Sequence, residues 1–291
     1  MARVDLPPSD AWRLRTATFE PARLPRLMGI VNVTPNSFSD GGRFLDPAVA
    51  IAHGRELVRQ GAEILDVGGE STQPYAPSVS VEEELRRTLP VVEALCRDAA
   101  VPVSIDTSKA VVAQAAVDAG AEIINDVTGL EGDPEMAPLA RDSQVGLCIM
   151  HMQGTPATMQ NCPTYADVVA EVAEYLAQRR ARLIADGIDP ARICLDPGIG
   201  FGKTHAHNLE LLRACGSMRR LGAPVLVGPS RKGFIGHVLG DKQADRTAGT
   251  VGVVLALARQ GVPFIRVHDV AAARQALLLF AAAGGLDSQG D

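Results

Sequence analysis

The stretch ICLDPGIGFGKT, residues 193–204, begins with a short apolar run and continues into a glycine-rich turn. The run stops at Asp196, and Pro197 and Gly198 follow it at once. Apolar runs of this length, bounded by turn residues, are typical of strands that are buried on both faces. The stretch therefore predicts a buried strand that presents a carboxylate at its carboxyl end.

Seven other runs in the chain have the same form, and a helical pattern follows each run. The eight runs are RLMGIVNV (26–33), AEILDVGG (62–69), VPVSIDT (101–107), EIINDV (122–127), GLCIMHM (146–152), ICLDPG (193–198), PVLVGPS (224–230) and FIRVHD (264–269). Strands that alternate with helices, without a break in composition, predict one closed (β/α)8 barrel, with an open doubly wound sheet as the competing architecture. We expect the barrel over residues 26–285, a short N-terminal extension or cap over 1–25 and a C-terminal tail over 286–291.

The composition suits an α/β barrel, because the chain has 291 residues and such barrels have about 250. Hydrophobic residues make up 46% of the chain and charged residues 21%, as in a domain with a large core. The net charge of −6 gives no reason to expect nucleic acid as a partner, and no apolar run is long enough to span a membrane. The five scattered cysteines predict neither a zinc site nor disulfides, and the first residues lack a secretory apolar segment, so we expect a cytoplasmic protein.

The end of the opening stretch, Gly202-Lys203-Thr204, is also how a phosphate-binding P-loop ends. A P-loop has its first glycine five positions before that Gly202, and Pro197 stands there. Proline has no N–H to donate to a phosphate, so we reject the P-loop interpretation. We interpret Asp196 as a carboxylate presented to a ligand, and the glycines as residues that let the backbone approach that ligand closely.

Polar side chains lie at or just past the carboxyl ends of the eight runs. They are Asn32, Asp66, Asp106, Asn125, Asp196, Lys232, Arg266 and His268. In a barrel these ends meet on one face, where barrel enzymes carry their catalytic groups. Arg266 and His268 are two positions apart on the last run, so their side chains should point the same way and form an anion site. No serine or cysteine near these positions has a paired base, so we expect no covalent nucleophile.

Eight collinear motifs resemble those of the dihydropteroate synthases, over almost the whole chain. They are MGIVNVTPNSFSDGG (28–42), DVGGESTQP (66–74), SIDTSK (104–109), IINDVTG (123–129), MHMQGTP (150–156), LDPGIGFGKT (195–204), GPSRKGFIG (228–236) and RVHDV (266–270). The resemblance implies a TIM barrel, a homodimer and a transferase of folate biosynthesis. Such an enzyme condenses 6-hydroxymethyl-7,8-dihydropterin pyrophosphate with p-aminobenzoate to 7,8-dihydropteroate, releasing pyrophosphate.

The resemblance also implies roles for individual residues. The pterin site would comprise Asp106, Asn125, Val127, Met150, Asp196, Phe201, Gly228 and Lys232. The p-aminobenzoate site and two lids would comprise Phe38, Asp40, Thr72, Gln73, Pro74, Ser230 and Gly233. Asn32, Arg266 and His268 would bind the pyrophosphate, and Asn32 would also help to hold Mg²⁺.

Catalysis would rest on five of these residues, by SN1-like loss of pyrophosphate before the amine attacks. They are Asp106, Asp196, Lys232, Arg266 and His268. Val127 could equally belong to the ordinary barrel core, and His151 is interpreted as structural.

Three positions depart from the family pattern. Gln73 and Tyr75 stand where the second lid usually has arginine and glycine, and Gly233 stands where serine is frequent. These changes fall in the second-substrate site, so we expect p-aminobenzoate to bind more weakly or in a different pose.

Two other functions stay open. One is a catalytically silent pterin-binding paralogue, and the other is a methyltetrahydrofolate:corrinoid methyltransferase, which neither needs nor releases pyrophosphate. Aldolase-type chemistry is disfavoured, because Asp106 and Asp196 are expected to raise the pKa of Lys232.

Overall fold

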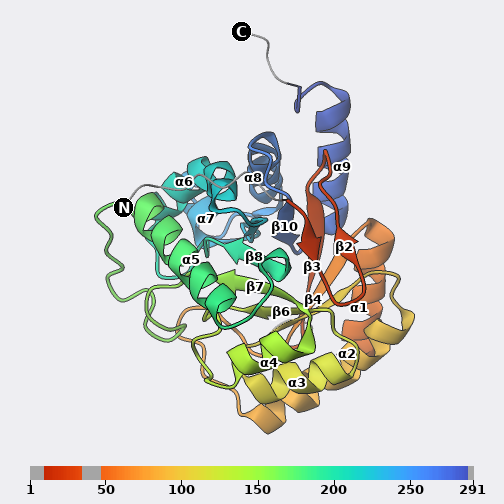
Figure 1. The fold of residues 1–291 in the computed structure, drawn as a ribbon. Coiled ribbons are helices and arrows are strands. Elements are labelled where there is room, and N and C mark those ends of the chain that lie inside the picture. The colour runs from red at the N-terminus through yellow and green to blue at the C-terminus, as the bar shows by residue number, and fades with distance from the viewer. Residues whose placement is uncertain (1–9, 35–46, 288–291) are drawn as a thin grey trace.

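Parallel strands form a nearly closed barrel at the centre of the molecule (Figure 1). The computed structural model describes residues 10–34 and 47–287. The strands are β3 (Arg26–Asn32), β4 (Ile64–Gly68), β5 (Val103–Asp106), β6 (Ile123–Asp126), β7 (Gly146–Met150), β8 (Ile193–Asp196), β9 (Leu226–Val227) and β10 (Phe264–Val267). They pair in the order β8-β7-β6-β5-β4-β3-β10-β9, and one bridge joins Leu195 of β8 to Val225, the residue just before β9. The predicted (β/α)8 barrel is confirmed, and each strand lies within its predicted run.

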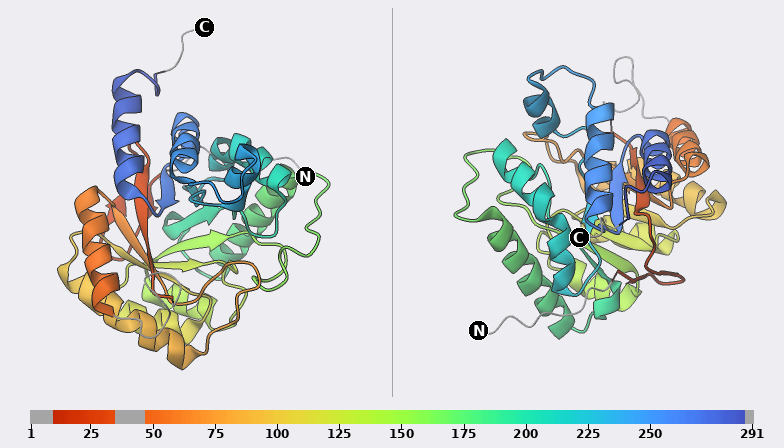
Figure 2. Two further views of the ribbon diagram at one scale, coloured as in Figure 1. Left: turned by 180° about the vertical axis from the view of Figure 1, so that it is seen from behind. Right: turned by 90° about the horizontal axis from the view of Figure 1, so that it is seen from above.

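Helices surround the strands, as the views from behind and from above show (Figure 2). They are α1 (Pro47–Gln60), α2 (Val81–Asp98), α3 (Ala110–Asp118), α4 (Met136–Ser143), α5 (Val168–Ala185), α6 (His205–Ala214), α7 (Gly233–Leu239), α8 (Thr247–Arg259) and α9 (Val270–Ala282), with 3₁₀ turns at Pro190–Arg192 and Cys215–Leu221. Both α7 and α8 follow β9, which differs from the one helix per strand that the sequence suggests. None of the described helices is long and apolar enough to cross a membrane.

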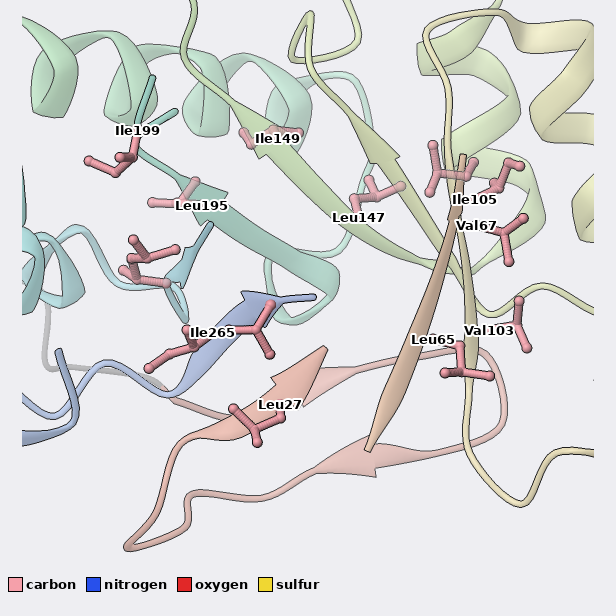
Figure 3. Close-up of a cluster of buried hydrophobic side chains, with 14 of the residues drawn as sticks. Leu27, Leu65, Val67, Val103, Ile105, Leu147, Ile149, Leu195, Ile199 and Ile265 are labelled. Atoms are coloured by element: carbon pink, nitrogen blue, oxygen red, sulfur yellow. The ribbon is translucent and has the colours of Figure 1, made fainter. Parts of the chain in front are cut away.

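Alternate residues of each strand face two different cores. Leu65 and Val67 of β4 belong to the cluster between the strands and the helices, part of which is drawn in Figure 3. Ile64, which points the other way, belongs to a second cluster inside the barrel. The members of this inner cluster are Trp12, Leu14, Met28, Ile64, Ile123, Cys148, Cys194, Leu226 and Phe264. Because both faces are apolar, the strands read as continuous apolar runs in the sequence.

The inward positions nearest the carboxyl ends are polar on several strands. Asp66, Asn125, Asp196 and Arg266 each follow an inner-core residue by two positions, so they share its side of the strand. The strand alternation therefore separates an apolar amino half of the barrel interior from a polar carboxyl half.

A hairpin formed by β1 (Trp12–Arg13) and β2 (Thr18–Phe19) packs into the amino half of this interior. Trp12 is fully buried, its ring meets Phe264 edge-on at 5.0 Å, and its Nε1 donates to the Arg192 carbonyl oxygen at 2.8 Å. The hairpin lies in the segment expected to cap the barrel, whereas the expected domain boundaries stay predictions.

Trp12→Ala should lower the free energy of unfolding by about 3–5 kcal/mol, because it leaves a void between the hairpin and the inner core. Trp12→Phe keeps an aromatic ring against Phe264 and should cost less. Denaturant titration followed by circular dichroism measures both. An alanine variant within about 1 kcal/mol of the parent would show that the hairpin is not part of the barrel core.

Candidate active site

A network of charged and polar side chains joins four strands at the carboxyl half of the barrel. The guanidinium of Arg266, from β10, donates through Nε to Asp66 Oδ2 of β4 at 2.6 Å and through Nη2 to Asp106 Oδ2 of β5 at 2.8 Å. Asn125 of β6 donates through Nδ2 to the same Asp66 oxygen at 3.0 Å. The structure thus brings together Asp106, Asn125 and Arg266, which the sequence assigned to the site.

Asp66 is the residue of this network that the site assignment missed. It was recognised as a strand-end polar residue, but no ligand role was implied for it. Asp66 is fully buried, and its Oδ1 has no hydrogen-bond partner among the described residues. Its observed contacts are those with Arg266 and Asn125, so its role is to hold these two side chains in place.

Two carboxylates share one guanidinium in this network, which affects their protonation. Burial raises the pKa of Asp106 to about 7; Arg266 opposes the shift and Asp66 adds to it. The expectation that Arg266 and His268 form an anion site stays a prediction, and two carboxylates already bind Arg266. Its Nη1 is the nitrogen without a partner in the described part of the chain.

Asp196 and Lys232 are two further charged residues at the carboxyl half of the barrel, and each influences the pKa of the other. Asp196 Oδ1 accepts from the Gly198 backbone N–H at 2.7 Å, and burial raises the pKa of Asp196 to about 6. The Lys232 Nζ lies 4.0 Å from the centroid of the Phe201 ring, a cation–π contact. Burial, helped by Arg266, lowers the pKa of Lys232 to about 8, although Asp196 and Asp106 oppose this. The expected net rise of the Lys232 pKa is therefore wrong, because desolvation outweighs the two carboxylates.

An apolar cluster separate from both barrel cores lies beside these residues. Its buried members are Val127, Met150, Met159 and Phe201, and Met152 packs against them. Val127 and Phe201 are thus not part of the ordinary core, and Met159 is a member that the sequence did not indicate.

His268 lies just past β10 and is held by Ser230. Ser230 Oγ accepts from the His268 backbone N–H at 3.2 Å and lies 2.9 Å from Nδ1 of the ring. The serine hydroxyl can then donate to Nδ1, which leaves the ring proton on Nε2. Burial, then Arg266, lowers the pKa of His268 to about 3, so the ring is a neutral donor near pH 7. The assignment of Ser230 to the second substrate stays a prediction.

Two glycines of the 198–204 segment, Gly198 and Gly202, lie against backbone of the segment after β7. A Cβ on Gly198, whose φ is 68°, would lie 2.0 Å from the His151 carbonyl oxygen, and one on Gly202 would lie 2.4 Å from the Gln153 carbonyl oxygen. They allow two backbone segments to pack together, so the interpretation that they let a ligand approach is not supported by these contacts.

The structure describes the residues assigned to the second lid, Thr72, Gln73 and Pro74, but not those assigned to the first lid. Phe38 and Asp40 lie outside the described residues. In the second lid Thr72 is half-buried, and Gln73 and Pro74 are exposed.

Two of the departures from the family pattern have structural consequences. Tyr75 has a φ of 64°, a conformation that glycine adopts more readily, and its hydroxyl lies 3.3 Å from Asn161 Oδ1. A Cβ on Gly233, the first residue of α7, would lie 3.5 Å from His205 Cε1, an ordinary contact distance. A side chain at position 233 would therefore be accommodated.

The remaining assigned positions lie at the ends of their strands. Asn32 is the last residue of β3 and pairs in register with Gly68. A Cβ on Gly228 would lie 3.8 Å from that of Arg266, so the glycine leaves space beside the guanidinium. The described residues hold no group of three or more His, Cys, Asp or Glu side chains that could bind a metal. They offer the amide oxygen of Asn32, which fits a magnesium ion held mainly by substrate oxygens.

Comparison with known proteins gives one consistent result. The model of a family described as pterin binding enzyme matches residues 28–268. The dihydropteroate synthase of Neisseria meningitidis serogroup C is 47% identical over 264 residues, which cover 89% of this chain and 93% of that protein.

Two solved structures of dihydropteroate synthase from Xanthomonas albilineans, each 45% identical, show the same fold. The one with 4-aminobenzoic acid has a TM-score of 0.87 and covers 94% of this chain and 98% of its own. The one in complex with 7,8-dihydropteroate has a TM-score of 0.80 and covers 89% and 94%. The resemblance inferred from the eight motifs is confirmed.

Arg266→Met should destabilise the protein by about 3–5 kcal/mol at alkaline pH, because it leaves two carboxylates buried without their cation. The pKa of Asp106 is already raised to about 7, and loss of Arg266 raises it further. Between that higher pKa and 7 the folded variant binds a proton that the folded parent does not, so the deficit should shrink as the pH falls toward 7 and level off below it, where the parent's Asp106 is protonated as well. Denaturant titrations at several pH values measure this, with Arg266→Lys as the charge-retaining control. A deficit that does not vary with pH would contradict the electrostatic assignment.

Proposed function

The chain belongs to the family of pterin binding enzymes, and on that premise we propose that it catalyses the dihydropteroate synthase reaction. It condenses 6-hydroxymethyl-7,8-dihydropterin pyrophosphate with p-aminobenzoate and releases pyrophosphate. The observation that carries the proposal is the buried Asp196 carboxylate beside the Lys232–Phe201 contact, on the same face as the Arg266 network. The matched relative and the two Xanthomonas structures are dihydropteroate synthases, which favours this reaction over both alternatives.

The pterin is recognised by the strand-end residues. Its aminopyrimidinone edge carries parallel N–H donors, which the Asp196 carboxylate accepts; one of its oxygens already accepts from Gly198. The amide oxygen of Asn125 faces the opposite way from its bound Nδ2 and accepts a further ring N–H, while Lys232 donates to a ring oxygen or nitrogen. The Phe201 ring and Met150 contact the flat face of the heterocycle. Each charge-assisted bond contributes about 1.5–3 kcal/mol.

The C–O bond to pyrophosphate breaks first, because the electron-rich dihydropterin stabilises a cation at its exocyclic methylene. Arg266 and the Nε2–H of His268 stabilise the negative charge that develops on the leaving group. The amine of p-aminobenzoate then attacks the methylene carbon and loses a proton. No residue forms a covalent intermediate, so the protein acts by positioning and electrostatic stabilisation.

The proposal includes a Mg²⁺ ion bound beside the pyrophosphate group of the substrate. Magnesium prefers oxygen ligands and keeps several waters, so the amide oxygen of Asn32 would hold it together with oxygens of the substrate. The ion would neutralise negative charge on the leaving group.

A homodimer in the cytoplasm completes the proposal. Exposed apolar side chains on the late helices, Val238 and Leu239 of α7 and Leu278 and Leu279 of α9, support association. The five free thiols suit a reducing compartment.

Steady-state release of pyrophosphate should require both substrates and Mg²⁺, because the amine must consume the cation before the next turnover. Asp196→Asn keeps the side-chain volume but replaces one acceptor oxygen by a donor, so kcat/KM for the pterin substrate should fall roughly 10- to 150-fold. The kcat/KM of Lys232→Ala for the pterin substrate should fall by a similar factor. Steady-state kinetics with a coupled pyrophosphate assay measures both variants. Tight pterin binding without turnover in the parent would favour a silent paralogue, and corrinoid-dependent methyl transfer would favour the methyltransferase.

Gly233→Ser combined with Gln73→Arg should lower the KM for p-aminobenzoate about tenfold, because the pair restores a hydroxyl and a cation for its carboxylate. The space beside Gly233 accommodates the new side chain. The KM for the pterin substrate serves as the internal control and should stay unchanged. A KM for p-aminobenzoate equal to or above that of the parent would contradict the assignment of these two positions.

A further inference from the structure

Lys203 is a buried cation for which neither the proposed reaction nor the rejected P-loop accounts. The side chain is 2% exposed. Its Nζ donates to the Phe201 carbonyl oxygen at 2.9 Å and to the His151 carbonyl oxygen at 3.3 Å, and it lies 3.0 Å from His151 Nδ1. The three partners account for the three protons of an ammonium group, and they belong to the segments that follow β7 and β8.

Three side chains donate hydrogen bonds to three consecutive carbonyl oxygens of the segment that carries Phe201. Gln160 Nε2 donates to Gly200 O at 3.0 Å, Lys203 to Phe201 O at 2.9 Å, and the Tyr165 hydroxyl to Gly202 O at 2.8 Å. Lys203 is the charged member of this set. Without these donors the Phe201 ring, and with it the cation–π contact of Lys232, would not be fixed.

The charge of Lys203 also acts on Asp196. Lys232 and then Lys203 are the cations that oppose the burial-driven rise of the Asp196 pKa, and Arg266 follows. Asp196 in turn supports the ammonium form of Lys203, whereas burial and Lys232 oppose it, so that the pKa of Lys203 is lowered to about 7.

The titratable rings around Lys203 are neutral near pH 7. Burial, followed by the charge of Lys203, lowers the pKa of His151 to about 3, so the ring is neutral and can accept through Nδ1. Tyr165 and Tyr175 pack against the His151 ring, and His207 packs against Tyr165. Burial raises the pKa of Tyr165 to about 12, which leaves its phenol neutral.

We propose that Lys203 is a positioning residue of the pterin site, whose ammonium group fixes the Phe201 wall and favours the carboxylate form of Asp196. The proposal rests on the proposed function and adds a residue to it. Lys203 does not touch the substrate. It acts through the backbone of Phe201 and through its charge on Asp196.

Lys203→Met keeps the length of the side chain and removes the charge, and Tyr165→Phe is its matched control. Tyr165→Phe removes a bond to the neighbouring carbonyl of the same segment without changing any charge. Both variants should raise the KM for the pterin substrate, Lys203→Met by about tenfold or more, with the KM for p-aminobenzoate unchanged.

The pH dependence of kcat/KM separates the positioning role of Lys203 from its electrostatic role. Ionised Asp196 is needed for pterin binding, so the parent's kcat/KM should fall as the pH drops through about 6. Lys203→Met should move this acid limb to higher pH by about half a unit, and Tyr165→Phe should leave it in place. An unmoved acid limb in Lys203→Met would overturn the electrostatic role, and an unchanged pterin KM would overturn the positioning role.

Lys203→Arg keeps the proposal testable if the methionine variant does not fold. Its charge does not titrate, so its acid limb should stay near that of the parent even where its larger side chain raises the KM. An acid limb shifted upward in Lys203→Arg would contradict the proposal. Failure of the parent to release pyrophosphate would overturn the proposed function instead. Calorimetric titration of the same variants with pterin across this pH range would then still decide the role of Lys203.

Discussion

A single guanidinium, that of Arg266, sets the electrostatics at the carboxyl end of this barrel. It binds two carboxylates inside the barrel, one of them fully buried, which without a cation would be costly to keep ionised. The same charge also acts on other groups: it opposes the raised pKa values of Asp106 and Asp196 and helps to lower those of Lys232 and His268. One side chain thus influences the protonation of Asp106 and of the three groups, Asp196, Lys232 and His268, to which the proposed reaction gives a role. The residues proposed for the pterin and those proposed for the pyrophosphate are therefore electrostatically coupled.

Much of this arrangement follows from the strand pattern, which is why the sequence predicts the fold and the face that carries the site. Apolar runs that end in polar residues indicate buried parallel strands, and the barrel places those ends together. The contact partners of each polar residue, in contrast, do not follow from the strand pattern. The contact of Arg266 with Asp66 and Asp106 depends on how β10, β3, β4 and β5 align, and this register is not encoded in any local stretch. Asp66 was therefore recognised as a strand-end residue but not as the partner of Arg266.

The errors of the sequence interpretation share a cause, which is that burial was not known. The pKa of Lys232 was expected to rise because two carboxylates were counted and desolvation was not. The glycines after β8 were assigned to ligand approach, yet at Gly198 and Gly202 it is the backbone of the segment after β7 that comes close. Lys203 was set aside with the P-loop, because only the structure shows that its ammonium group is enclosed by carbonyl oxygens and a histidine ring. A motif identifies such residues, but their energetic role depends on what surrounds them.

The departures from the family pattern lie outside the hydrogen-bond network around Arg266. In this network the charged groups affect one another, so a substitution there disturbs several groups at once. Gln73 and Tyr75 lie on an exposed lid, and Tyr75 keeps the left-handed backbone at that position while its hydroxyl contacts Asn161. Gly233 opens space that His205 borders without filling it. The residues proposed for the second substrate can therefore vary while the network around Arg266 is preserved.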